Sequence, residues 1–200
     1  MTEKTNVIAT ALSDVQIKRA AEKAKTNLMF VTVTGVGTAL YVVACLCLQV
    51  PVFENYYLCL GYIVMAVYLY SFGIVSGTIV GTLGCFLYCL LISGLRGMPG
   101  WVLGNLFIGI SLGWTLKIVR RIKNKPIQYI INTIAVIMYS AAAMLVIKSY
   151  TEVLLYSQPF WLRAGKNFYA FAADAFVLAF SLPICMNLDG LIRKNFLTKN

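Results

Sequence analysis

The sequence contains no histidine, and its six cysteines form no C-x-x-C pair. A structural zinc site needs four Cys or His ligands at characteristic spacing, so we expect no metal and no cofactor. The cysteines lie within or beside apolar segments, where a free thiol packs as a small hydrophobic group. A disulfide framework, which is typical of small secreted domains, is not expected either.

Charge is also scarce in this chain. Only 12% of the residues are charged, and none lies between Glu54 and Arg96, whereas soluble domains average about 25%. As one helix this uncharged run would be roughly 60 Å long, and the hydrocarbon core of a bilayer is about 30 Å thick. The run must therefore cross, turn and cross back, and the sequence predicts an all-α integral membrane protein.

Groups for catalysis are missing as well. Acid–base or metal-assisted chemistry needs paired carboxylates, histidine, or a nucleophile with a base, and Asp174 is the only acid inside a predicted span. The chain has no P-loop for ATP hydrolysis and no inverted repeat of the kind found in many secondary transporters. We therefore do not expect an enzyme.

Charged and turn-forming residues divide the chain into six predicted spans. Pro51 ends the first span, and the Pro- and Gly-rich stretch at 96–100 separates the third from the fourth. The spans are predicted at 28–50, 57–71, 74–95, 101–119, 127–147 and 168–188. They form a transmembrane domain at 28–190, which lies between an N-terminal segment at 1–27 and a basic tail at 191–200.

The basic residues predict the orientation in the membrane. With the N-terminus inside, the inner segments carry thirteen Lys and Arg residues and the outer segments carry four. Cytoplasmic segments are enriched in these residues, so both termini are expected in the cytoplasm. A nucleic-acid partner would need a soluble basic face with interleaved aromatic residues, and the sequence offers none.

The N-terminal segment at 1–27 lacks the pattern of a cleavable signal peptide. Ser13 and Gln16 have the spacing of a helix capping box, and Ile8 and Leu12 lie on one helix face. The segment is interpreted as an amphipathic cytoplasmic helix on the inner leaflet of the bilayer. A helix that docks a partner is the alternative.

Four glycines recur on one helix face in the stretch FGIVSGTIVGTLG at 72–84. Each glycine in a helix interior costs about 1 kcal/mol relative to alanine, but small residues let helices approach closely in lipid. The stretch is therefore interpreted as a helix-packing face, made by Gly73, Gly77, Gly81 and Gly84. A sliding surface against a partner is the alternative.

Polar residues near the outer ends of two spans suggest a ligand site. Asp174 and Asn105 are predicted at similar depth on the sixth and fourth spans. Convergent polar groups in an aromatic-lined cavity are typical of small-ligand sites. The candidate ligand-binding residues are Trp101, Asn105, Trp161, Lys166, Asn167 and Asp174.

Other interpretations of these residues stay open. Asp174 could lock two helices by pairing with Lys166 or with a Ser or Thr hydroxyl, or it could relay a proton or ion. The tryptophans could belong to the aromatic belts at the membrane interfaces.

Two stretches, GYIVMAVYLYSFGIVSGTIVGTLG and SGLRGMPGWVLGNLFIGISLG, resemble the substrate-binding S-component of energy-coupling factor (ECF) vitamin transporters. The resemblance covers roughly 31–114. The last third agrees in the number of spans and in having polar residues at the outer start of the sixth. The chain departs from the family at Cys85, where many members have a polar or acidic residue.

The resemblance implies a subunit of a prokaryotic cell membrane that captures a vitamin-like molecule at the outer face. Its lids would be the outer segments at 51–56, 96–100 and 149–166. Its partners would be a membrane T-component and two cytoplasmic ATPases. The family's Ala-x-x-x-Ala contact for the T-component corresponds here to Gly35 and Ala39.

Two further classes remain possible from the sequence. A self-sufficient carrier would transport its substrate alone in liposomes. A membrane assembly or regulatory subunit would bind no small molecule.

Overall fold

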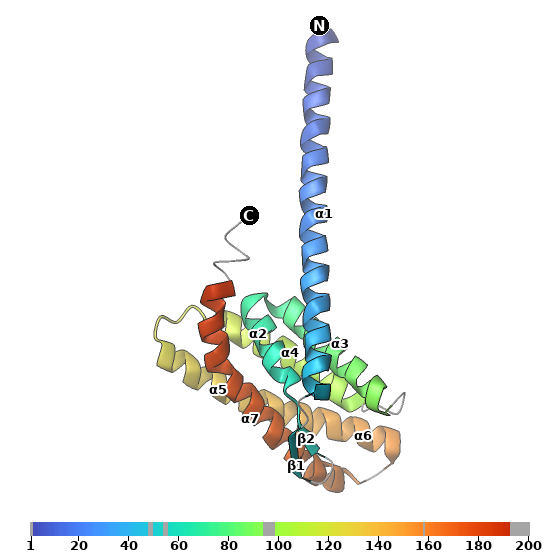
Figure 1. Ribbon diagram of the computed structural model, residues 1–200, viewed down its shortest axis with the longest axis vertical. Helices are drawn as coiled ribbons and strands as arrows, with labels where there is room; N and C mark the ends of the chain where they lie inside the picture. Colours follow the sequence, from blue (N-terminus) through green and yellow to red (C-terminus); the bar gives the residue numbers. More distant parts are fainter. Residues whose placement is uncertain (1, 48–49, 54–55, 94–98, 158, 193–200) are drawn as a thin grey trace.

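The structure is a computed structural model that describes residues 2–47, 50–53, 56–93, 99–157 and 159–192, with side chains for 22–47, 58–92, 99–157 and 159–188. The chain folds as a bundle of helices with one short β-hairpin (Figure 1). The elements are, in order, α1 (Thr2–Cys47), β1 (Val50–Phe53), β2 (Tyr56–Leu58), α2 (Gly61–Ser71), α3 (Ile74–Ser93), α4 (Pro99–Val119), α5 (Lys125–Ala141), the π-helix η2 (Ala142–Lys148), α6 (Ser149–Tyr156) and α7 (Phe160–Ile192).

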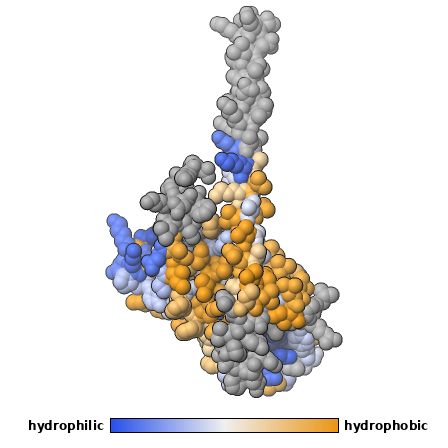
Figure 2. Space-filling view, in the orientation of Figure 1, coloured by the Kyte–Doolittle hydropathy of each residue, from blue (hydrophilic) through white to orange (hydrophobic). Residues whose placement is uncertain are grey.

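Five helical segments are long and apolar enough to cross a bilayer, at 22–47, 74–92, 99–119, 125–156 and 160–188. Their outward surfaces carry many exposed large hydrophobic side chains, which suits contact with lipid rather than water. Figure 2 shows this apolar surface across the bundle, with hydrophilic residues on α1 beyond it and at the turn between α4 and α5. The prediction of a multi-pass helical membrane protein is confirmed.

The second predicted span, at 57–71, is shorter than expected. Helix α2 has 11 residues, which gives a length of about 16 Å, so it cannot cross a bilayer core by itself. It packs against α1, α3, α4 and α7, and most of its side chains are buried. Helix α2 is therefore an internal element around which the longer helices assemble.

A two-stranded antiparallel hairpin connects α1 to α2 and was not predicted. Strand β1 pairs with β2 in a register that places Val50 opposite Leu58 and Pro51 opposite Tyr57. The residues of the strands are mainly β-branched or aromatic, and these types favour extended backbone. The hairpin uses the first residues of the predicted second span, which is why α2 begins only at Gly61.

The glycine-rich stretch contains one turn residue and three packing residues. Gly73 lies between α2 and α3 with a φ of 98°, a conformation that favours glycine, so the prediction of a packing role for Gly73 is wrong. A Cβ on Gly77 would lie 2.5 Å from the backbone nitrogen of Leu69, and one on Gly84 would lie 2.6 Å from the ring of Tyr41. At Gly81 it would overlap with Met65. These three glycines let α3 approach α2 and α1 closely.

The segment at 149–166, predicted as an outer lid loop, is mostly helical. The helical path runs from Lys125 through η2 to Tyr156, and α7 already begins at Phe160. The polar side chains that suggested a loop are paired across helices, because Asn167 on α7 donates hydrogen bonds to Ser149 and Glu152. The second predicted lid, at 96–100, lies largely outside the described residues, and its last two residues begin α4.

Helix α1 runs without a break from Thr2 to Cys47, past the predicted boundary at 27/28. The sequence before Gly35 contains neither proline nor glycine, so no residue there favours a helix end. The predicted separation of an N-terminal amphipathic helix from the first span is not observed. The side chains that would define its apolar face, and residues 193–200 of the basic tail, lie outside the described residues.

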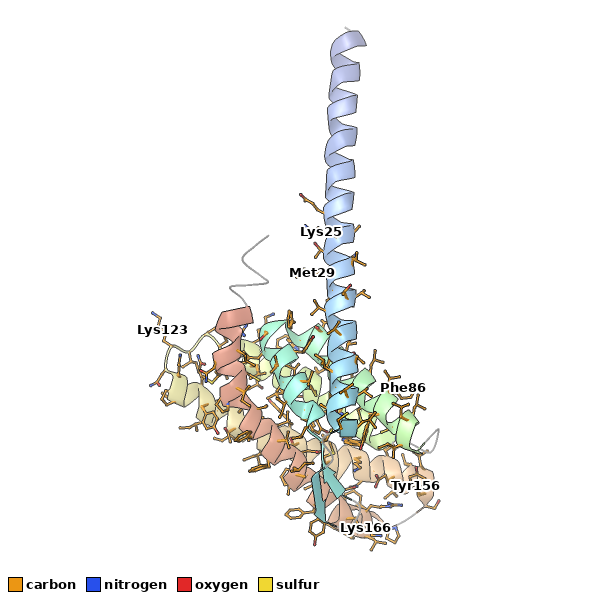
Figure 3. The ribbon with its side chains drawn as sticks, in the orientation of Figure 1. Lys25, Met29, Phe86, Lys123, Tyr156 and Lys166 are labelled. Carbon is orange, nitrogen blue, oxygen red and sulfur yellow. The ribbon has the colours of Figure 1, made fainter. Side chains whose placement is uncertain are left out.

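The N-terminal end of α1 and the C-terminal end of α7 lie at the same end of the molecule (Figure 1). Figure 3 places Lys25 and Lys123 toward that end and Lys166 at the opposite end, near the hairpin. The segments predicted to be cytoplasmic therefore gather at one end of the bundle.

Candidate functional site

The hydroxyl of Tyr62, on α2, is the centre of a buried polar cluster. It lies 2.6 Å from Oδ1 of Asn105 and 3.2 Å from Oδ2 of Asp174, and it accepts a hydrogen bond of 2.9 Å from Nε1 of Trp101. Because a phenol carries a single proton, the two acceptors share it. Tyr62 and Asn105 are 0% exposed and Asp174 is 3% exposed, so these three side chains are shielded from solvent.

Asn105 is held from both ends of its amide group. Its Oδ1 accepts from Tyr62, while its Nδ2 donates to the hydroxyl of Tyr41 at 3.2 Å and to the carbonyl of Gly81 at 3.3 Å. Because the Gly81 carbonyl can only accept a hydrogen bond, the amide nitrogen of Asn105, rather than its oxygen, must face it. Four helices thus contribute to this group, which we call the Tyr62 cluster: Tyr41, Tyr62, Trp101, Asn105 and Asp174.

A buried lysine lies beside the Tyr62 cluster. The Nζ of Lys148 is 5.7 Å from the ring centroid of Trp101, within the range of a cation–π contact, and the residue is 5% exposed. Lys148 is the last residue of the π-helix η2, a distortion that occurs frequently at functional sites.

A second polar cluster joins α6 to α7. Nδ2 of Asn167 donates to Oγ of Ser149 and to Oε2 of Glu152, both at 3.0 Å, and Arg163 lies 3.8 Å from the same Glu152 oxygen. Glu152 is buried within the helical segment at 125–156. The prediction that Asp174 is the only acid inside a span is therefore wrong, because the polar stretch that contains Glu152 continues the fifth helix.

The structure brings together only some of the candidate ligand residues. Trp101, Asn105 and Asp174 meet at Tyr62, whereas Asn167 belongs to the second cluster. Trp161 is 84% exposed and lines an open apolar hollow with Phe160 and other residues of η2 and α7, and Lys166 is exposed. Lys148 contacts the Tyr62 cluster through the ring of Trp101.

Three residues of the site escaped sequence analysis. Tyr41 and Tyr62 lie in apolar runs, where a tyrosine is common and carries no specific signal. Lys148 was assigned to an outer loop because it follows the predicted end of the fifth span. No proline or glycine separates Lys148 from the predicted fifth span, and this was the one sequence signal that the helix continues through Lys148.

Gly35 and Ala39 are exposed on α1, and a Cβ added to Gly35 would meet nothing within 4 Å. Among the residues that the structure describes, no group of three or more His, Cys, Asp or Glu side chains is placed to hold a metal ion.

The fold and the site together define a multi-pass membrane protein with a buried polar cluster among its helices. The family model for the S component of the ECF-type riboflavin transporter matches residues 25–188. The chain belongs to this family, and the resemblance drawn from the sequence is confirmed. The family is one of substrate-binding membrane subunits and not a class of enzymes.

Proposed function

We propose that this chain captures riboflavin, or a closely related flavin, through the Tyr62 cluster. The observation that carries the proposal is the convergence of Trp101, Asn105 and Asp174 on one buried hydroxyl, in a chain of the riboflavin S-component family. Uptake is proposed to require a membrane T-component and two cytoplasmic ATPases.

The chemistry of a flavin suits this cluster. A flavin combines a flat aromatic ring system, whose pyrimidine edge offers an N–H donor and carbonyl acceptors, with a chain of hydroxyl groups. The amide of Asn105 supplies both a donor and an acceptor, and the carboxylate of Asp174 supplies acceptors. The indole of Trp101 adds an aromatic surface that can lie against the ring system.

A bound ligand has to replace the hydrogen bonds that the side chains of the Tyr62 cluster make with each other. Asn105 and Asp174 each accept a hydrogen bond from Tyr62, and all three residues are at most 3% exposed. Binding therefore requires movement of the helices that meet at the cluster, followed by exchange of internal hydrogen bonds for bonds to the ligand. We propose that Trp161, Lys166 and Asn167, from the first turns of α7, contact the ligand as it enters.

The proposed orientation puts the hairpin end of the bundle outside and both termini in the cytoplasm. It is supported by the excess of basic residues in the inner segments. The N-terminal end of α1, the C-terminal end of α7 and Lys123 lie toward one end of the molecule, while Lys166 lies at the other (Figure 3). In this orientation the exposed face of Gly35 and Ala39 is proposed to contact the T-component within the membrane.

Flavin fluorescence provides the test of binding. Riboflavin titrated into the purified protein is expected to lose fluorescence saturably at a 1:1 ratio, because the bound ring contacts an aromatic side chain. Trp101→Phe should weaken the quenching, and Trp114→Phe should leave it unchanged because Trp114 is exposed. A titration without saturable binding would overturn the proposal.

Transport needs a separate test. Proteoliposomes with the chain alone are expected to show no ATP-driven accumulation of riboflavin, and those that also contain a T-component and the ATPases should accumulate it. Accumulation by the chain alone would identify a self-sufficient carrier instead.

A further inference from the structure

Two cysteines from different elements lie in direct contact beside the Tyr62 cluster. Cys45 is on α1, and Cys59 lies between β2 and α2. Their Sγ atoms are 3.2 Å apart, and both residues are buried, at 2% and 4% exposure.

The start of α2 is built to admit this contact. A Cβ on Gly61 would lie 2.6 Å from Sγ of Cys45 and 2.9 Å from the ring of Tyr41, so a side chain at this position would push α1 away. The hydroxyl of Tyr41 lies 3.5 Å from Sγ of Cys59 and also accepts the hydrogen bond from Asn105. The thiol pair is therefore connected to the Tyr62 cluster through one side chain.

We infer that Cys45 and Cys59 are a redox-sensitive pair whose disulfide staples α1 to the start of α2 and restricts opening of the Tyr62 cluster. A disulfide has an S–S length of about 2.05 Å, so the sulfur atoms have to approach by about 1 Å. The staple would join the two helices that contribute Tyr41 and Tyr62. Its effect on ligand binding rests on the proposed function, but the formation of the bond does not.

The oxidant in this reaction is a small disulfide from the surrounding medium, which reaches the buried pair when the helices at the Tyr62 cluster move apart. One cysteine attacks it as a thiolate, which forms a mixed disulfide and releases one small thiol. The other cysteine then attacks the first cysteine's sulfur, forms the Cys45–Cys59 bond and releases the second small thiol. Two protein thiols are oxidised, and one small disulfide is reduced to two thiols.

The other cysteines are less suited to this reaction. Cys85 and Cys89 lie one turn apart on α3, where Cβ atoms are about 5–6 Å apart, whereas a disulfide needs about 3.5–4.5 Å. Cys47 is exposed on α1 and has no thiol contact among the described side chains. Cys47 therefore serves as the control for nonspecific oxidation.

The test uses the full chain, purified and treated with 2-hydroxyethyl disulfide. Thiols that remain are then counted by alkylation after denaturation, and linked peptides are identified by mass spectrometry. Wild type should fall from six alkylated cysteines to at most four, with Cys45 joined to Cys59 and with the exposed Cys47 open to capping by the reagent. Cys47→Ser should form the same link, whereas Cys45→Ser and Cys59→Ser should form no internal link. Six alkylated cysteines after treatment, or a link through Cys47, would overturn the inference.

The second arm measures riboflavin association by stopped-flow fluorescence. The oxidised protein should bind with an association rate reduced by roughly threefold or more, because binding that requires a conformational change is slowed when the change is restricted. Reduction should restore the rate, and Cys45→Ser should show no response to the oxidant. An unchanged rate in fully linked protein would overturn the restriction of opening. If reduced protein binds no riboflavin, the proposed function fails while the thiol count still decides whether the staple forms.

Discussion

The Tyr62 hydroxyl and the Asn105 side-chain oxygen are 2.6 Å apart, although the residues are 43 positions apart in the chain. This bond ties the 11-residue helix α2 to the membrane-spanning helix α4. The same hydroxyl also receives the indole N–H of Trp101. The packing of α2 against α4 and the proposed ligand recognition therefore depend on one phenol oxygen.

Tyr62→Phe is expected to destabilise the protein. The substitution removes the partner of the Asn105 oxygen and of the Trp101 nitrogen, and an unsatisfied buried polar group costs about 1–3 kcal/mol. Thermal unfolding in detergent should show a lower Tm. The matched control is Tyr150→Phe, because Tyr150 is 60% exposed and its loss of a hydroxyl should change little. Equal Tm values for the two variants would contradict the central role of Tyr62.

Asn105→Ala and Asp174→Ala are each expected to weaken riboflavin binding by roughly ten- to a hundredfold. Loss of a buried hydrogen-bond partner costs about 1–3 kcal/mol, and each 1.4 kcal/mol is a factor of ten in affinity. Calorimetric titration of the folded variants measures the change, with Trp114→Phe as the control. A residue that only locks helices would lower Tm without a specific loss of affinity. Unchanged affinity in both alanine variants would remove the proposed site.

Gly77→Ala and Gly35→Ala form a pair with opposite expected effects. A methyl group on Gly77 would lie 2.5 Å from the backbone of Leu69, whereas one on Gly35 would meet nothing within 4 Å. Overpacking typically costs about 1–3 kcal/mol, while alanine in an open helix position gains up to about 1 kcal/mol. Gly77→Ala should therefore lower Tm, and Gly35→Ala should maintain or raise it. The reverse order would show that α3 does not depend on close approach to α2.

The double variant Gly35→Leu with Ala39→Leu is expected to block assembly with the T-component. Larger side chains would prevent close helix approach at this exposed face, while riboflavin binding by the isolated chain should remain unchanged. Co-purification with the T-component and ATPases measures the loss. Gly165→Leu is the control, since Gly165 also has open space around it but lies on α7. Stoichiometric co-purification of the double variant would show that the contact lies elsewhere.

The long spans could be predicted because membrane crossing leaves a strong one-dimensional signal. Uncharged apolar runs, with proline and glycine at their ends, placed α3, α4 and most of α7 near their observed positions. The hairpin was missed because 51–56 was predicted as an outer loop and 57–71 as a span. Tyr57 and Leu58 are compatible with either a strand or a helix, so hydropathy did not show that the second strand occupies the start of that span.

The site was only partly predictable for a related reason. Asn105 and Asp174 stand out as polar residues in apolar segments, and such residues are costly in a membrane. Tyr62 does not stand out, because its ring is apolar and only its hydroxyl joins the cluster. Glu152 and Lys148 were misplaced because their partners come from other helices, and pairing across helices has no local sequence pattern.

The uninterrupted course of α1 has a mechanical consequence. A single rigid rod of roughly 70 Å carries Gly35 and Ala39 on its outer surface and Tyr41, in contact with Cys59 and Asn105, on its inner surface. Ala39 and Tyr41 are two residues apart on α1. A rotation or shift of this helix against a neighbour outside the bundle would therefore also displace the Tyr41 hydroxyl. The proposed docking face and the proposed ligand site therefore lie on opposite sides of the same stretch of α1.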